Sequence, residues 1–202
     1  MKPWLAAIAF TLVSATGAHA FQPSVDAAIG KYKSGKLVDF RDVGTLMREA
    51  AKWCYAYEDQ TCAWTDVYFD VDEEGAVFEI NNAWDAERNV GFTDIAVFEG
   101  NRICQSGYDW VPTVWAERRD DDSVISGRDL HDLKQEIYAN RVVPLNEADD
   151  CFDYLYLGAD TDSETITLLQ RQYVDGVHEP TSDVEVSLYF NAEDAASLSL
   201  RW

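Results

Sequence analysis

Apolar and polar side chains alternate with a period of two residues along much of this 202-residue chain. Residues 66–72, 76–81 and 184–190 follow the pattern most cleanly. Successive side chains of a β-strand point to opposite faces, so this period indicates strands with one buried and one polar face. Such strands are typical of antiparallel sheets, which can leave one face open to water or to a ligand.

The predicted elements follow from the positions where this period begins, ends or changes. Apolar side chains with helical spacing predict helices near 24–33, 39–53 and 128–140. Turn-forming residues separate eight predicted strands. These strands lie near 66–72, 76–81, 90–98, 102–110, 152–157, 165–174, 184–190 and 195–202.

The order of these elements is helix followed by four strands, twice over. It predicts an α+β fold, in which helices pack on one face of an antiparallel sheet. One arrangement of that fold has two tandem helix-plus-four-strand units, at 21–118 and 119–202. The same string of elements also fits one continuous domain that includes both ranges.

The first twenty residues have the pattern of a bacterial secretory signal peptide. Lys2 provides a positive charge, the segment 4–13 is apolar, and Ala18-His19-Ala20 matches the small-x-small cleavage pattern. An apolar run of this length is too short to span a bilayer. We therefore expect cleavage after Ala20, a periplasmic or secreted product, and no membrane span in the mature chain. The alternative is an uncleaved N-terminal anchor.

All four cysteines, Cys54, Cys62, Cys104 and Cys151, follow the predicted cleavage point. An even number of cysteines in an exported protein favours disulfide bonds. Three pairings are possible. We favour Cys54 with Cys62, because a short loop brings its ends together at little entropic cost, which leaves Cys104 with Cys151. A zinc site is disfavoured because the sequence lacks a CxxC pair. We expect no metal and no cofactor.

Acidic residues outnumber Lys and Arg by 37 to 16, which gives a formal net charge of −21. Nucleic-acid binding requires clustered basic residues, so this balance argues against a nucleic-acid partner. A surface of this sign instead favours association with a basic partner through long-range attraction.

Two groups of aromatic and acidic residues fall where predicted strands end. The candidate ligand-binding residues are Trp84, Asp85, Tyr108, Asp109, Trp110 and Trp115. Aromatic rings provide flat apolar area, and a carboxylate accepts hydrogen bonds from sugar hydroxyls or pairs with a cation. The pattern thus predicts a non-catalytic binding protein that recognises a basic protein or a glycan at the sheet edge. In the alternative interpretation, Trp110 and Trp115 only plug the end of the sheet.

Two other function classes stay open from the sequence. A periplasmic hydrolase could use carboxylates, or one of the two histidines that follow the predicted signal, His131 and His178. The sequence contains no GxSxG, SxxK or HExxH motif, so an enzyme is the less favoured class. An enzyme requires a pocket that holds a histidine and a carboxyl group of shifted pKa. The third class is a structural envelope protein without a discrete site.

Overall fold

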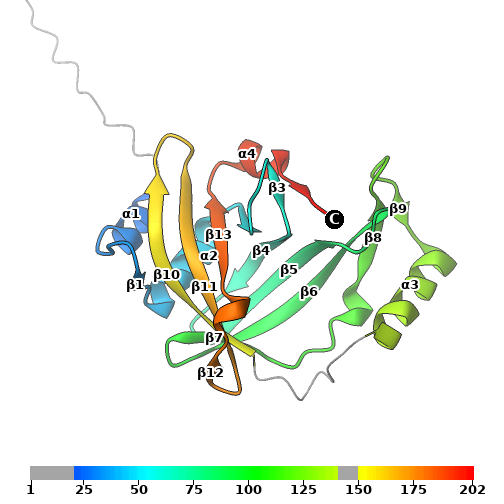
Figure 1. The fold of residues 1–202 in the computed structure, drawn as a ribbon, viewed down its shortest axis with the longest axis horizontal. Coiled ribbons are helices and arrows are strands. Elements are labelled where there is room, and N and C mark those ends of the chain that lie inside the picture. The colour runs from blue at the N-terminus through cyan, green and yellow to red at the C-terminus, as the bar shows by residue number, and fades with distance from the viewer. Residues whose placement is uncertain (1–20, 141–149) are drawn as a thin grey trace, which may run out of the picture.

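A computed structural model describes residues 21–140 and 150–202 of the chain (Figure 1). The predicted signal peptide, residues 1–20, lies outside the described residues. Within the described part of the chain, no helix is both long enough and apolar enough to cross a membrane.

Eight antiparallel strands of the described residues close into a barrel. Each strand pairs with the next barrel strand along the chain, and the last strand returns to pair with the first. The barrel strands are β2 (Lys52–Tyr55), β4 (Trp64–Val71), β5 (Gly75–Ala83), β6 (Arg88–Glu99), β7 (Arg102–Gln105), β10 (Asp150–Asp160), β11 (Thr165–Val174) and β13 (Val184–Tyr189).

The predicted α+β fold, an antiparallel sheet packed by helices on one face and arranged in two tandem units in one version, is therefore wrong. The ranges 21–118 and 119–202 both supply strands to the same closed ring, which is joined at the β7–β10 and β13–β2 pairs. The alternating pattern shows which residues share a face of a strand, but it does not show whether the two edges of a sheet meet.

Large apolar side chains from all around the ring fill most of the barrel interior. An eight-stranded barrel is just wide enough for such filling or for one small ligand. The buried interior side chains include Trp53, Tyr55, Ala76, Phe78, Ala96, Ile103, Tyr154, Ile166, Leu168, Val186 and Leu188. Burial of each large apolar side chain stabilises the fold by about 1.5–3 kcal/mol.

The two N-terminal helices, α1 (Pro23–Ile29) and α2 (Phe40–Glu49), cover one end of the barrel. Buried side chains of α2, including Leu46 and Met47, join the barrel core. The Arg48 guanidinium donates to the carbonyl of Val71 at the end of β4. The Phe40 and Phe98 rings meet at a centroid distance of 5.9 Å near the end of β6. These contacts lie at strand ends, so the helices form a cap on the barrel.

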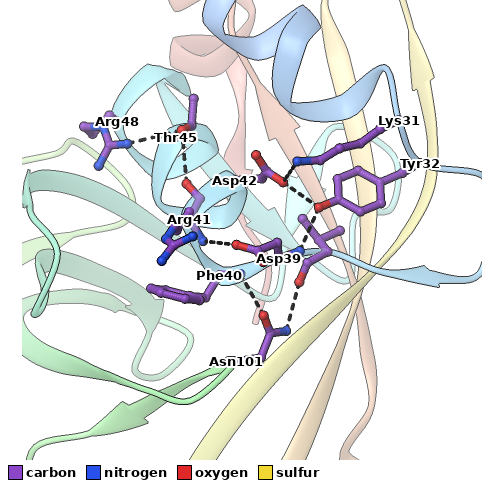
Figure 2. A network of polar contacts seen from close by, with 10 residues as sticks. Lys31, Tyr32, Asp39, Phe40, Arg41, Asp42, Thr45, Arg48 and Asn101 are labelled. Atoms are coloured by element: carbon purple, nitrogen blue, oxygen red, sulfur yellow. Dashed lines mark hydrogen bonds and ion pairs between the residues drawn. The ribbon is translucent and has the colours of Figure 1, made fainter.

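Polar contacts attach this cap to the β6–β7 turn and fix its internal geometry (Figure 2). The Asn101 side chain in that turn accepts from the Phe40 amide at 3.0 Å and donates to the Val38 carbonyl at 3.1 Å. The Tyr32 hydroxyl donates to Asp42 at 2.5 Å. Asn101 thereby satisfies two backbone groups just before and at the start of α2, where a helix lacks partners of its own.

The sheet extends beyond the ring through two further strands that follow β6. The first part of β6 pairs with β8 (Trp115–Arg118), whereas its last part pairs with β7. Strand β9 (Val124–Ile125) and helix α3 (Gly127–Asn140) follow β8 and enclose a separate apolar cluster. We call residues 110–140 the α3 extension. It lies on the opposite side of the molecule from α1 and β1 (Lys36–Leu37), which pairs with β10 (Figure 1).

Several element boundaries differ from the predicted ones. The helix predicted over 39–53 ends at Glu49, because β2 begins at Lys52. The strand predicted over 195–202 instead begins within helix α4 (Ala192–Ser197), whose N-terminal amides bond to the Asn191 side chain. Only β14 (Ser199–Leu200) is extended there, in parallel with β3 (Thr61–Cys62). Strand β12 (Val177–His178) and the short 3₁₀ turns Val111–Thr113 and Pro180–Ser182 complete the fold.

The cysteines pair as predicted, Cys54 with Cys62 and Cys104 with Cys151. Cys54 lies in β2, next to the loop that leads to β4. Cys104 and Cys151 are direct register partners on β7 and β10, so their bond crosses the seam where the barrel closes. This bond lies at a point where strands from the two halves of the sequence meet.

Candidate functional site

A cavity of about 360 Å³ lies inside the barrel, away from the helical cap. It is lined where β2 ends at Tyr55, where β4 begins at Trp64, and where β7 ends at Gln105. The exposed residues Gln105 and Ser182 mark its edge toward solvent. The helices contact the opposite ends of the strands, so one end of the barrel is capped and the other contains the cavity.

The apolar wall of the cavity consists mainly of aromatic rings. Tyr55 stacks on Trp64 with ring centroids 4.6 Å apart, and Tyr68 stacks on Phe78 at 5.0 Å. Trp53 packs edge-on against Tyr68. Rings that are held by their neighbours in this way lose little freedom when a ligand binds, which favours affinity.

A few polar groups of the cavity wall are buried without a full set of partners. Asp66 is only 5% exposed, and its Oδ1 atom has no hydrogen-bond partner among the described residues. The Tyr55 hydroxyl likewise has none within that part of the chain. The indole N–H of Trp53, a core residue that does not line the cavity, has none there either. Asp66 Oδ2 accepts only a long bond, 3.4 Å, from the Tyr68 hydroxyl. Unpaired buried polar groups destabilise a fold, so their presence in the cavity wall indicates a functional role.

Removal from water raises the pKa of the Asp66 carboxyl group to about 7. The hydroxyls of Tyr55 and Tyr68 oppose that rise in part, and the charge of Asp94 adds to it. The Tyr55 hydroxyl lies close enough to influence the carboxyl group, yet no hydrogen bond of ordinary geometry joins the two. Burial also raises the pKa of Asp94. None of the described residues that line the cavity is Lys, Arg or His.

Two of the predicted site residues support the barrel wall from either side of the sheet. The Trp110 ring stacks on Phe92, a cavity-lining residue, at a centroid distance of 4.1 Å. The Trp115 indole donates to Glu79 at 2.9 Å and lies directly against Gly91, where a Cβ atom would collide with the ring. Both indoles are only partly exposed.

The other four predicted residues lie at the edge of the α3 extension. The Trp84 indole donates to Glu136 of α3 at 3.2 Å, and Asp85 pairs with Arg88. Asp109 accepts a bond of 2.9 Å from Tyr138 of α3, and its neighbour Tyr108 is exposed. The structure thus brings Trp84, Asp109 and Trp110 to α3, but places Trp115 on the opposite face of the sheet. Their role in recognition stays a prediction.

The two histidines lie outside the cavity. His131 is exposed on α3, and His178 contacts the Asp183 carboxylate at 2.9 Å. Neither lines the cavity that holds the shifted carboxyl group of Asp66. In residues 21–140 and 150–202, no three His, Cys, Asp or Glu side chains gather into a group that could hold a metal ion.

Sequence reasoning missed the cavity and its polar residues, Asp66, Tyr55, Tyr68, Tyr154 and Gln170. The available signal was the alternation of Trp64, Asp66 and Tyr68, of which Asp66 and Tyr68 lie on one face of the strand predicted over 66–72. That face combines a carboxylate with two large aromatic rings, which is unusual for a face in water. Comparison of the chain with family models, with curated proteins and with solved structures finds no match in any of the three.

Proposed function

We propose that this protein binds one small, largely apolar molecule inside the barrel. The observation that carries the proposal is the 360 Å³ cavity with its aromatic wall and few polar groups. Ligand sites in proteins occupy roughly 300–1,000 Å³ and combine apolar walls with a few polar groups that orient the ligand. The mouth of an eight-stranded barrel is a common place for such a site.

Two further observations support a binding role outside the cytoplasm. The disulfides favour an oxidising compartment, in agreement with the signal peptide predicted from the sequence. Two stacked ring pairs, Tyr55 with Trp64 and Tyr68 with Phe78, shape the cavity wall and support the binding role itself. We therefore propose a periplasmic or secreted carrier that holds its ligand without transforming it.

The proposal predicts that a bulky side chain at the cavity mouth blocks binding. Asn82 lines the cavity on β5, whereas Val77 lies on the other face of the same strand. We expect the neutral dye prodan to bind with a saturable blue shift of its emission. Asn82→Trp should weaken that binding roughly tenfold or more, because the indole takes up space that the dye needs. Each CH₂ group of the dye that is no longer buried costs about 0.8 kcal/mol.

Val77→Trp is the matched control and should bind the dye like the unmodified protein. Circular dichroism of both variants checks that each one folds. If prodan shows no saturable binding to the unmodified protein, or binds both variants equally well, the barrel interior is not the binding site.

A second candidate function is recognition of a basic protein or a glycan at the α3 extension. The observation that favours it is the exposure of Tyr108 and Tyr138 beside Asp109. The Tyr108→Ala, Tyr138→Ala double variant should then weaken binding of cytochrome c, a basic protein, or of cell-wall glycan fragments by roughly tenfold. Prodan binding should be unchanged. If the double variant binds cytochrome c and the glycan fragments as tightly as the unmodified protein does, this surface is not a recognition site.

A further inference from the structure

The one ionisable side chain among the described residues that line the cavity, apart from tyrosines, is the carboxyl group of Asp66. The side chain is 95% removed from solvent, and no ion pair joins it to a basic residue of the described chain. The buried carboxylate of Asp153, in contrast, has a basic partner. The Arg171 guanidinium donates two hydrogen bonds of 2.7 Å to it. Asp66 thus lacks the partner that a buried carboxylate normally has.

The unsatisfied atoms in the cavity define what a ligand must provide. Asp66 Oδ1 is an acceptor, and the Tyr55 hydroxyl can accept as well as donate. A ligand that satisfies both therefore needs N–H or O–H donors at one end. An anionic ligand would instead be repelled by Asp66 and by the second buried acid of the barrel, Asp94.

Aromatic faces flank the carboxyl group along its own strand. Trp64 and Tyr68 lie two residues before and after Asp66, and all three line the cavity. Their stacking partners, Tyr55 and Phe78, widen the aromatic wall on each side. Aromatic faces attract organic cations, and the attraction is strongest where the contact is removed from water.

We propose, on the basis of the ligand-binding function above, that the natural ligand is a small organic amine. Its ammonium group lies at Asp66, where it donates to the unpaired carboxylate oxygen and replaces the missing basic partner. Its apolar body lies among the aromatic rings. The net charge of −21 raises the local concentration of cations around the protein and so favours capture of such a ligand.

The test compares three probes of nearly the same shape by titration calorimetry at pH 8. The probes are 2-phenylethylamine, which is a cation at this pH, 2-phenylethanol, which is neutral, and 3-phenylpropionate, which is an anion. We expect the amine to bind roughly tenfold or more tightly than the alcohol, as a charge-assisted hydrogen bond predicts. The anion should bind more weakly than either of them.

Two variants assign the preference to one carboxyl group. Asp66→Asn has nearly the same shape and should lower the amine affinity roughly tenfold, with little change for the alcohol. Asp70→Asn removes an exposed acid of the same strand and should leave all three affinities unchanged.

The outcomes separate this inference from the proposed function. Equal affinities for amine and alcohol in the unmodified protein, or an amine preference that persists in Asp66→Asn, would overturn the amine assignment. The barrel would then still be a binding site for neutral molecules. If prodan, the alcohol and the amine all fail to bind, the proposed function fails and the amine assignment fails with it.

Discussion

Replacement of both Cys104 and Cys151 by alanine is expected to lower the free energy of unfolding by about 4 kcal/mol. That change corresponds to a decrease of roughly 10 °C in melting temperature for a chain of this size. The bond spans 47 residues, so its loss restores considerable freedom to the unfolded chain. It also crosses the shortest seam of the barrel, where the described parts of β7 and β10 share two register pairs. Thermal melts followed by circular dichroism measure the effect.

The matched control is the replacement of both Cys54 and Cys62 by alanine. Their loop spans 8 residues, so the same chain-entropy argument gives about 2.5 kcal/mol. The first pair of substitutions should also weaken prodan binding, because Cys104 lines the cavity. A larger loss of stability in the control would contradict the expectation that the Cys104–Cys151 bond stabilises the fold more than the Cys54–Cys62 bond.

The second large effect is a gain of stability on neutralising Asp66 that depends on pH. The pKa of its carboxyl group is about 7 in the folded protein and 3.8 in the absence of structure. Since the folded state binds this proton more tightly, ionisation destabilises the fold progressively as the pH rises from about 3.8 to 7. Asp66→Asn removes that cost. We expect the variant to gain up to about 4 kcal/mol at pH 8.5 and about 2 kcal/mol at pH 5.5.

Urea denaturation of both proteins at the two pH values measures this difference. Glu73→Gln, which neutralises an exposed acid in the β4–β5 turn, should change the unfolding free energy by less than about 0.5 kcal/mol at either pH. A gain that is the same at pH 5.5 and 8.5 would mean that the Asp66 carboxyl group ionises as it does in water.

Local features of the fold could be predicted from the sequence because they depend on neighbouring residues. Helix α3 lies where its apolar spacing placed it, β11 and β13 match their predicted ranges closely, and both disulfides join the predicted pairs. Ring closure could not be predicted in this way. It depends on the β7–β10 and β13–β2 pairs, which join segments far apart in the sequence and leave no trace in a two-residue period.

The candidate site was missed because β4 places its more polar face inward. Asp66 and Tyr68 face the cavity, whereas Phe69 is 59% exposed. A register shift between Tyr68 and Asp70 then brings Val71 back to the core. Hydrophobic periodicity identifies the apolar face of a strand as the buried one, and this rule fails where a barrel encloses a cavity with polar groups.

The division of β6 between two neighbouring strands has a consequence for how ligand preference can evolve. Phe92 lies in the cavity wall, yet Trp110 of the α3 extension stacks on it. Substitutions in the extension can thus reposition a wall residue without touching the ligand, while the capped end of the barrel stays intact. Related chains could therefore diversify their ligands through the sequence of residues 110–140, with the ring itself preserved.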